Sequence, residues 1–181
     1  MKSYLLGVWN TIDPIYYTCT RLRYIPEDEH HNTIFRVRLT RYKGSSVVLQ
    51  DGTVIHKNDV LIKIHLHNVK IINDIQSIKS EMKRAVFIYH MVKRSLPRLA
   101  HYVKNHPKNE DIKGIIGITT LHKGVNHLGF EVFSIRNSYY RSYKKLTFLP
   151  INLLASTSQQ GEPVYLFMSK TDLVTRYAAP N

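Results

Sequence analysis

The sequence predicts a single α/β (α+β) domain over residues 1–181, with a mixed sheet whose N-terminal strands are antiparallel and which is covered by one long helix and shorter helices. Three patterns support this fold class. Apolar and polar residues alternate along Thr33–Thr40 and Val60–His67, as in half-buried strands. Apolar residues recur every three or four positions from Ile75 to Val103, which indicates a long helix. Ile112–Thr119 is a continuous apolar run that suits a strand buried on both faces.

Two turns are predicted upstream of the strand Val60–His67. Asp51-Gly52 separates two β-branched runs, so Val47–Ile55 should form a hairpin whose glycine takes the positive φ of a tight turn. Asn58-Asp59 predicts a second turn, because asparagine tolerates the left-handed region. We expect Asn68, which follows the strand, to cap the next element.

Two helices are predicted in the first two thirds of the chain. Ser3 to about Tyr24 has apolar residues at helical spacing and should be an amphipathic helix bent at Pro14, followed by a loop from Ile25 to Asn32. The long helix should kink or break at Pro97 and end at Asn105-His106-Pro107.

The C-terminal third should supply further strands and short helices. We expect a short helix at Val125–Leu128 capped by Gly129, a strand at Phe130–Ile135, a final strand at Pro163–Met168, and a terminal helix at Thr171–Tyr177 capped by Ser169. Residues 137–155 interleave tyrosines with Arg and Lys, which suits a partly buried surface helix or a contact with an anionic membrane. Residues 156–161 should form a polar loop.

Composition indicates a folded, strongly basic protein. The chain has 181 residues, of which 43% are hydrophobic, a formal charge of +13 and a pI near 9.8. Such a charge attracts nucleic acid, anionic lipid or phosphate-bearing envelope polymer, although dispersed charge also serves solubility. Cys19 is the single cysteine, which excludes an internal disulfide and is compatible with a reducing compartment. Without a signal peptide or a long apolar segment, we expect a cytoplasmic protein, or one peripheral at the membrane.

The alternating strands predict a cationic sheet face. If Thr33–Thr40 and Val60–His67 share one antiparallel sheet, their apolar residues face a common core and their polar residues share the other face. The ligand-binding candidates on that face are Arg36, Arg38, Lys63, His65 and His67. A solvated sheet face without a binding role is the alternative, because antiparallel sheets commonly leave one side in water.

A second group of candidates lies where strands end. Thr119, Thr120 and His122 follow the buried strand Ile112–Thr119, and open α/β sheets bind ligands beyond the carboxyl ends of their strands. Asn68 follows the strand that carries His65. The alternative for the group after Ile112–Thr119 is a capping threonine and a surface histidine.

No metal or cofactor is predicted. His65 and His67 form a His-x-His pair on one strand face, but zinc needs at least three protein ligands, and His56 is the only other imidazole nearby in the sequence. A phosphate-cradling glycine loop and a Gly-x-Ser-x-Gly nucleophile motif are also lacking.

The order of the segments resembles the YkoP-like family. The resemblance rests on FRVRLTRYKG, LQDGTVIHKNDVLIKIHLHN, the long basic helix, GIIGITTLH, LGFEVFSI and PVYLFMSKTDLVTRY, and it extends from about Trp9 to Tyr177. Family members are small stand-alone proteins of Gram-positive spore-formers, and similar domains follow polysaccharide deacetylase domains in envelope proteins. The family pattern is a Gly-Asp turn and a His-Leu-x-Asn strand end. Asp59, His65, Leu66 and Asn68 match this pattern, Asn58 replaces the glycine, and Lys63 occupies a position that is often acidic.

Three hypotheses about function follow. The first is a non-catalytic module that binds an anionic envelope glycan or lipid-linked component, such as a phosphorylated sugar, an envelope polymer or an anionic lipid, on the cationic face. The second is a small hydrolase or transferase with His65 as general acid or base and Asn68, Thr119 or His122 orienting the substrate. The third is non-specific nucleic-acid binding, which the charge favours but which no recognisable motif supports.

Overall fold

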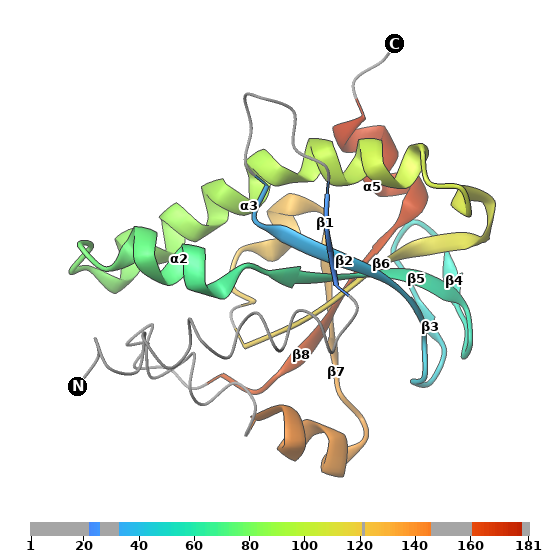
Figure 1. Cartoon of the computed structure of the whole chain (residues 1–181). Helices are drawn as coiled ribbons and strands as arrows, with labels where there is room; N and C mark the ends of the chain where they lie inside the picture. The colour runs from blue at the N-terminus through green and yellow to red at the C-terminus, as the bar shows by residue number, and fades with distance from the viewer. Residues whose placement is uncertain (1–21, 26–32, 121, 146–160, 179–181) are drawn as a thin grey trace.

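The computed structural model describes residues 22–25, 33–120, 122–145 and 161–178, which are built on a six-stranded sheet of order β1-β2-β5-β6-β8-β7 (Figure 1). Its strands are β1 (Arg23–Tyr24), β2 (Phe35–Arg41), β5 (Val60–Leu66), β6 (Ile112–Thr119), β7 (Glu131–Ser134) and β8 (Val164–Ser169). β5 and β6 pair in parallel, and the other neighbouring strands pair antiparallel. The predicted mixed sheet, with antiparallel N-terminal strands and further strands from the C-terminal half, is confirmed.

Both predicted turns upstream of β5 are confirmed. β3 (Val47–Val48) and β4 (Val54–Ile55) form an antiparallel hairpin in which Gly52 has a φ of +83°. Asn58 has a φ of +74°, and it is the one non-glycine residue with positive φ in the described ranges. The Asp59 carboxylate closes that turn by accepting a hydrogen bond from the His56 backbone N–H at 2.8 Å. The strand β5 therefore starts from a turn with a fixed geometry.

The long helix begins later than its apolar stripe predicted. The described helices are α2 (Asn68–Ile75), α3 (Glu81–Lys104), α5 (Lys170–Tyr177), a helical segment at 138–145, and the 3-10 turns η1 (Asn109–Asp111) and η2 (Val125–Leu128). Ile75 ends α2, and α3 starts after Ser80, whose hydroxyl accepts a hydrogen bond from the Lys83 backbone N–H at 3.4 Å. The apolar spacing continues across this break, whereas the cap at Ser80 starts a new helix. In the parts of the chain that the structure describes, no helix is both long and apolar enough to cross a bilayer.

Three other predictions about helices need correction. α3 runs through Pro97, so Pro97 does not break it, whereas the predicted end at Asn105 is confirmed. The buried side chains around Pro97 hold the helix on the sheet, which offsets the backbone hydrogen bond that proline cannot make. His67, and not Asn68, occupies the cap position of α2. The predicted N-terminal helix is wrong at its end, because Arg23 and Tyr24 form β1.

Several predicted segments lie wholly or partly outside the described residues. These are the remainder of the N-terminal helix, most of the loop after it, the second half of the 137–155 segment, and the loop that follows. Within the described C-terminal part, β6 has the predicted bounds and Gly129 ends η2 with a φ of +83°. The Ser169 hydroxyl accepts a hydrogen bond from Asp172 N–H at 2.9 Å, which confirms the predicted cap of the terminal helix.

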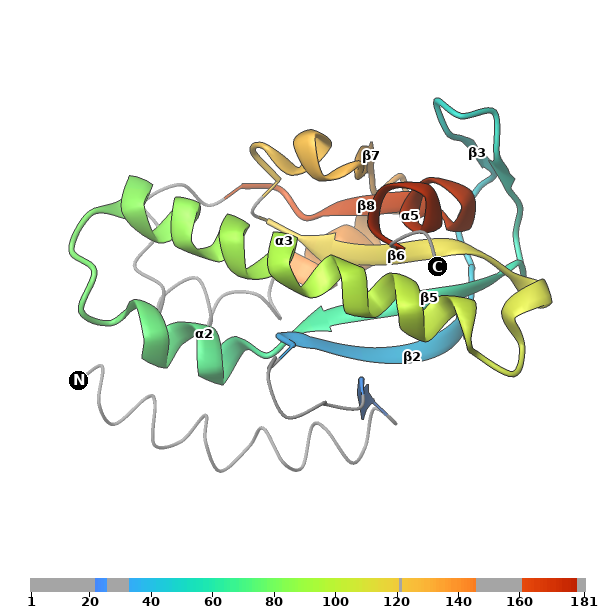
Figure 2. The same ribbon diagram turned by 90° about the horizontal axis from the view of Figure 1, so that it is seen from above.

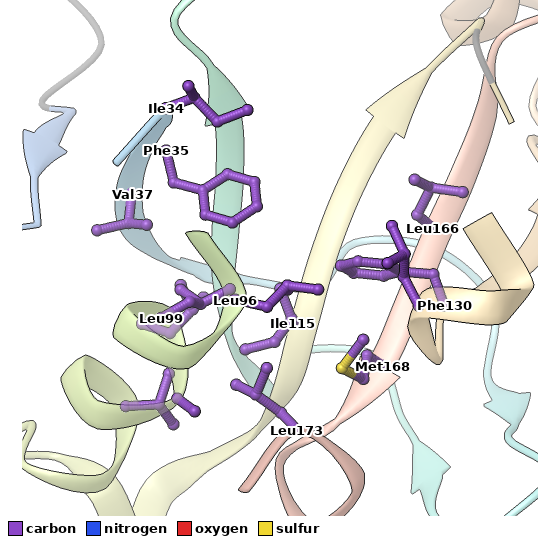
Figure 3. Close-up of a cluster of buried hydrophobic side chains, with 14 of the residues drawn as sticks. Ile34, Phe35, Val37, Leu96, Leu99, Ile115, Phe130, Leu166, Met168 and Leu173 are labelled. Carbon is purple, nitrogen blue, oxygen red and sulfur yellow. The ribbon is translucent and has the colours of Figure 1, made fainter. Parts of the chain in front are cut away.

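The main core lies between the sheet and α3. Buried side chains from the C-terminal half of α3 pack against the side chains of β2, β5, β6 and β8 that alternate toward it (Figure 3). Members of this core include Phe35, Val37, Ile62, Leu96, Leu99, Ala100, Val103, Ile115, Leu166, Met168 and Leu173. Figures 1 and 2 show α3 and α5 on the same side of the sheet, and side chains of both helices belong to this core.

A second, smaller core forms on the opposite face. Tyr42, Leu49, Ile55, Leu61, Ile116 and Phe167 pack together where the β3–β4 hairpin covers the sheet. The 138–145 helix lies on this side too (Figure 1). The hairpin covers only part of the face, and the polar side chains of β2 and β5 occupy the remainder.

Removing a side chain from the α3 contact should destabilise the whole protein. Leu99 has no exposed surface, so Leu99→Ala should lower the free energy of unfolding by about 2–5 kcal/mol through lost burial and a residual cavity. Met82 lies on the same helix with 75% of its surface exposed, and Met82→Ala should change stability by less than about 0.5 kcal/mol. Urea denaturation compares the two. Similar losses for both variants would contradict the packing described for α3.

Candidate functional site

Four of the predicted site residues lie together on β2 and β5. The antiparallel register pairs Arg36 with His65 and Arg38 with Lys63. Directly opposed residues in an antiparallel pair project from the same face, and the residues that alternate with these four project into the core. The structure thus brings Arg36, Arg38, Lys63 and His65 together as the alternation predicted. Their role in binding stays a prediction.

Arg36 is the most buried of these cations, with 4% of its surface exposed. Its Nε and Nη2 donate hydrogen bonds to the Tyr24 hydroxyl at 2.9 and 2.6 Å. Its guanidinium carbon also lies 5.0 Å from the centre of the Tyr24 ring. Tyr24 is paired with Arg36 across β1 and β2, so this short strand fixes the guanidinium against the sheet.

His67 belongs to the same edge of the sheet but contacts a different neighbour. Its ring lies edge-on to Tyr24 with the ring centres 5.7 Å apart, and its backbone N–H donates to the Ile34 carbonyl at 2.8 Å. Asn68 is the first residue of α2. His67 therefore lines the Tyr24 and Arg36 end of the cationic face, and Asn68 marks the point where the chain leaves it.

Burial and neighbouring cations lower the pKa of both Lys63 and His65. Burial, followed by the charges of Lys144 and Arg38, lowers the pKa of Lys63 to about 8. Burial, followed by Lys63, Arg38, Lys144 and Arg36, lowers the pKa of His65 to about 3. At neutral pH His65 is therefore an uncharged imidazole, whereas Lys63 loses its proton at mildly alkaline pH.

Lys144 completes the cluster from the 138–145 helix. The Tyr140 ring stacks on Tyr165 of β8 with ring centres 6.5 Å apart, which holds this helix on the sheet. The Lys144 ammonium lies 5.5 Å from the ring centres of both Tyr140 and Tyr143. Burial and the charge of Arg38 lower the pKa of Lys144. We define the cationic cluster as Arg36, Arg38, Lys63, His65 and Lys144.

The residues predicted at the end of β6 follow the strand that lies next to β5. β5 and β6 are parallel, so Thr119, Thr120 and His122 lie at the same end of the sheet as the carboxyl end of β5. Thr119 pairs with Val164 of β8, and Thr120 is buried. The Nδ1 atom of His122 is buried and makes no hydrogen bond within the described residues. The sequence placed these residues at the correct strand end, on β6 and the loop after it.

The described residues include no group of three His, Cys, Asp or Glu side chains that could hold a metal ion. His56, the third imidazole considered from the sequence, lies in the segment that joins β4 to β5. Its Nδ1 atom is 3.2 Å from the hydroxyl oxygen of Ser46. His65 is instead surrounded by cations, which disfavour a bound divalent cation. The chemistry offered by the cluster is attraction of negative charge.

Comparison with known protein families matches residues 2–177 to the YkoP domain. The chain belongs to the YkoP family. A relative from Bacillus subtilis (strain 168), titled "Uncharacterized protein YkoP", is 50% identical over 181 residues, which cover 98% of each chain. No solved structure matches. The resemblance inferred from the strand and turn motifs is confirmed.

Sequence reasoning missed Lys144 of the cationic cluster and Tyr24, which contacts Arg36 of that cluster. Tyr24 was assigned to a helix, because a strand of two residues has no periodicity to detect. Lys144 was noted only as part of a basic and aromatic stretch. That stretch signalled contact with negative charge, but the local sequence could not reveal that its helix packs beside Lys63.

The pKa of His65 should make stability depend on pH. It is about 3 in the folded protein and 6.5 in the unfolded chain, so the unfolded chain binds the proton more readily between these values. The contribution of neutral His65 to the free energy of unfolding is complete above pH 6.5 and is lost as the pH falls toward 3. Urea denaturation from about pH 7 to pH 4 should show a shallower loss of stability for His65→Gln than for wild type. The exposed His90→Gln serves as control, and a wild-type slope in His65→Gln would contradict the assignment.

Proposed function

We propose that this protein binds an anionic ligand at the cationic cluster. The observation that carries the proposal is the convergence of Arg38, Lys63 and Lys144, from three separate elements, around one half-buried strand face. Two of these side chains have lowered pKa values because burial and like charges disfavour their protonated forms. A bound anion would stabilise those protonated forms.

The chemistry of the side chains supports a phosphate or carboxylate group on the ligand. Guanidinium groups form paired hydrogen bonds with planar or tetrahedral oxyanions, and an ammonium adds a compact charge. The neutral imidazole of His65 would donate one N–H without adding charge. Arg36 is held by Tyr24, so it would contribute a preorganised positive charge.

A phosphorylated envelope glycan or a lipid-linked envelope component is the ligand class that we favour. The family resemblance supports it, because similar domains follow polysaccharide deacetylase domains. The charge of +13 would attract any polyanion from a distance. Selectivity would then depend on the fixed spacing of the cluster.

A catalytic role for His65 has less support. A general base is most effective when its pKa lies near the working pH, and a pKa of about 3 leaves the imidazole a weak proton acceptor at neutral pH. Binding without chemical transformation therefore remains the proposal.

Arg38→Gln should weaken binding of the anion by about tenfold to a hundredfold, because it removes a charge-assisted hydrogen bond. Isothermal titration calorimetry with inorganic phosphate, a phosphorylated sugar, a glycerol-phosphate oligomer and an oligonucleotide would measure this at two salt concentrations. Lys113→Gln is the matched control, because it removes one charge at an exposed position on β6. Arg36 is kept, since it joins β1 to β2.

The affinity should also fall by up to about tenfold for each pH unit above 8, where Lys63 loses its proton in the unbound protein. If Arg38→Gln and Lys113→Gln lose equal, small and salt-sensitive amounts of affinity for every anion tested, binding follows net charge alone. A preference for the oligonucleotide that depends on Arg38 would favour nucleic acid over an envelope component.

A further inference from the structure

The first half of α3 supplies partly buried side chains to the edge of the core (Ile88, Tyr89, Met91 and Val92) but no fully buried one. Among the helix residues, Ser95, Leu96, Leu99, Ala100 and Val103 are buried, and all of them lie in its second half. No residue from Glu81 to Arg94 is buried. Both views show this half of α3, together with α2, extending past the ends of the labelled strands (Figures 1 and 2). We call the segment from Asn68 to Arg94 the helical arm.

The helical arm exposes apolar side chains. Met82 has 75% of its surface exposed, Val86 49% and Phe87 36%. Removing the apolar area of each side chain from water is favourable. Three such side chains within two helical turns form a cluster, unlike the isolated exposed apolar residues of an ordinary surface. The helix is therefore amphipathic, with part of its apolar surface turned away from the sheet.

Basic side chains surround these apolar ones. Helical spacing of three, four and seven residues puts Lys83, Val86, Phe87 and His90 on one face of α3. Lys93 and Arg94 follow on the next turn of the same face, and both are exposed. Across α3, six Lys and Arg side chains accompany one carboxylate, that of Glu81.

We propose that the helical arm docks on an anionic lipid surface. A helix that lies in the bilayer interface needs apolar side chains to enter the acyl boundary and flanking Lys or Arg to contact the headgroups. The exposed face of α3 has both. This proposal does not depend on the ligand of the cationic cluster, which lies on the opposite face of the sheet.

Charge and apolar exposure together favour lipid over other occupants. A second copy of the chain related by a two-fold axis would bring the same cations against each other. Nucleic acid would match the positive charge, but contacts with its phosphate groups would leave the apolar side chains of Val86 and Phe87 in water. The other membrane candidate, the basic and aromatic helix at 138–145, has less available charge, because Arg141 and Lys145 lie 3.8 and 2.9 Å from the Glu162 carboxylate.

Vesicle co-sedimentation tests the proposal with the full chain. We expect binding to vesicles of phosphatidylglycerol and phosphatidylcholine and little binding to phosphatidylcholine alone. Lys83→Gln with Arg94→Gln should weaken binding by about 25-fold, since each cation near an anionic surface contributes about fivefold. Val86→Ser with Phe87→Ser should weaken vesicle binding at least as much, although this variant leaves the net charge of the protein unchanged.

Matched controls keep the test specific to the arm. Lys104→Gln with Lys113→Gln removes two exposed cations elsewhere, and Val48→Ser removes an apolar side chain that is 64% exposed on β3. Both controls should bind vesicles within about twofold of wild type. Losses equal to those of the arm variants would overturn the proposal in favour of generic attraction.

A spectroscopic probe locates the contact. Phe87→Trp should shift its fluorescence to the blue on adding anionic vesicles, whereas Val48→Trp should not, and Trp9 gives both proteins the same background. An unchanged Phe87→Trp spectrum with vesicles bound would overturn docking through the arm. A blue shift without vesicles that grows with protein concentration, with a dimer on gel filtration, would assign the surface to a second copy and overturn the lipid proposal, as would a blue shift caused by oligonucleotide alone.

Discussion

The antiparallel pairing of β2 with β5 determines both faces of the sheet. In this register Phe35 opposes Leu66 and Val37 opposes Ile64, which supplies the apolar surface for α3. The intervening pairs, Arg36 with His65 and Arg38 with Lys63, project from the other face. A slip of one residue would send the side chains of the slipped strand to the wrong face, so core packing also fixes the position of the cations.

Assembling these cations costs free energy, and the packing around them offsets it. Like charges and burial disfavour protonated Lys63, as its lowered pKa records. Arg36 is stabilised by the Tyr24 hydroxyl, and Lys144 by two tyrosine rings. Burial of Leu99 and its neighbours in α3 supplies the larger favourable term. The apolar face of the sheet thus permits a polar face that would not form alone.

Local patterns were sufficient to predict most of the sheet. Alternation gave β2 and β5, the glycine and asparagine turns gave the segment between them, and a serine cap gave the start of α5. The same alternation predicted that one face of the sheet carries Arg36, Arg38, Lys63 and His65. The break between α2 and α3 was missed, because the apolar stripe crosses it and only Ser80 marks the new start.

What the sequence could not supply depends on contacts between distant segments. Tyr24 meets Arg36 only because β1 pairs at the sheet edge, and Lys144 meets Lys63 only because Tyr140 stacks on Tyr165. The neutral state of His65 follows from these contacts and from burial. A histidine on an alternating strand suggests a group that titrates near neutral pH, yet three-dimensional crowding by cations removes that property.

The turn and strand-end pattern on which the family resemblance rests divides into two parts with different physical roles. Asn58 holds a φ of +74°, a conformation that glycine adopts without strain, and the Asp59 carboxylate accepts the His56 N–H. These two residues set where β5 begins. The second part carries His65 onto the cationic face through the register that this turn starts. Lys63 stands opposite Arg38, where an acidic residue would form a cross-strand ion pair. In this chain the two opposed side chains carry the same charge, and the charge of Arg38 contributes to the lowered pKa of Lys63.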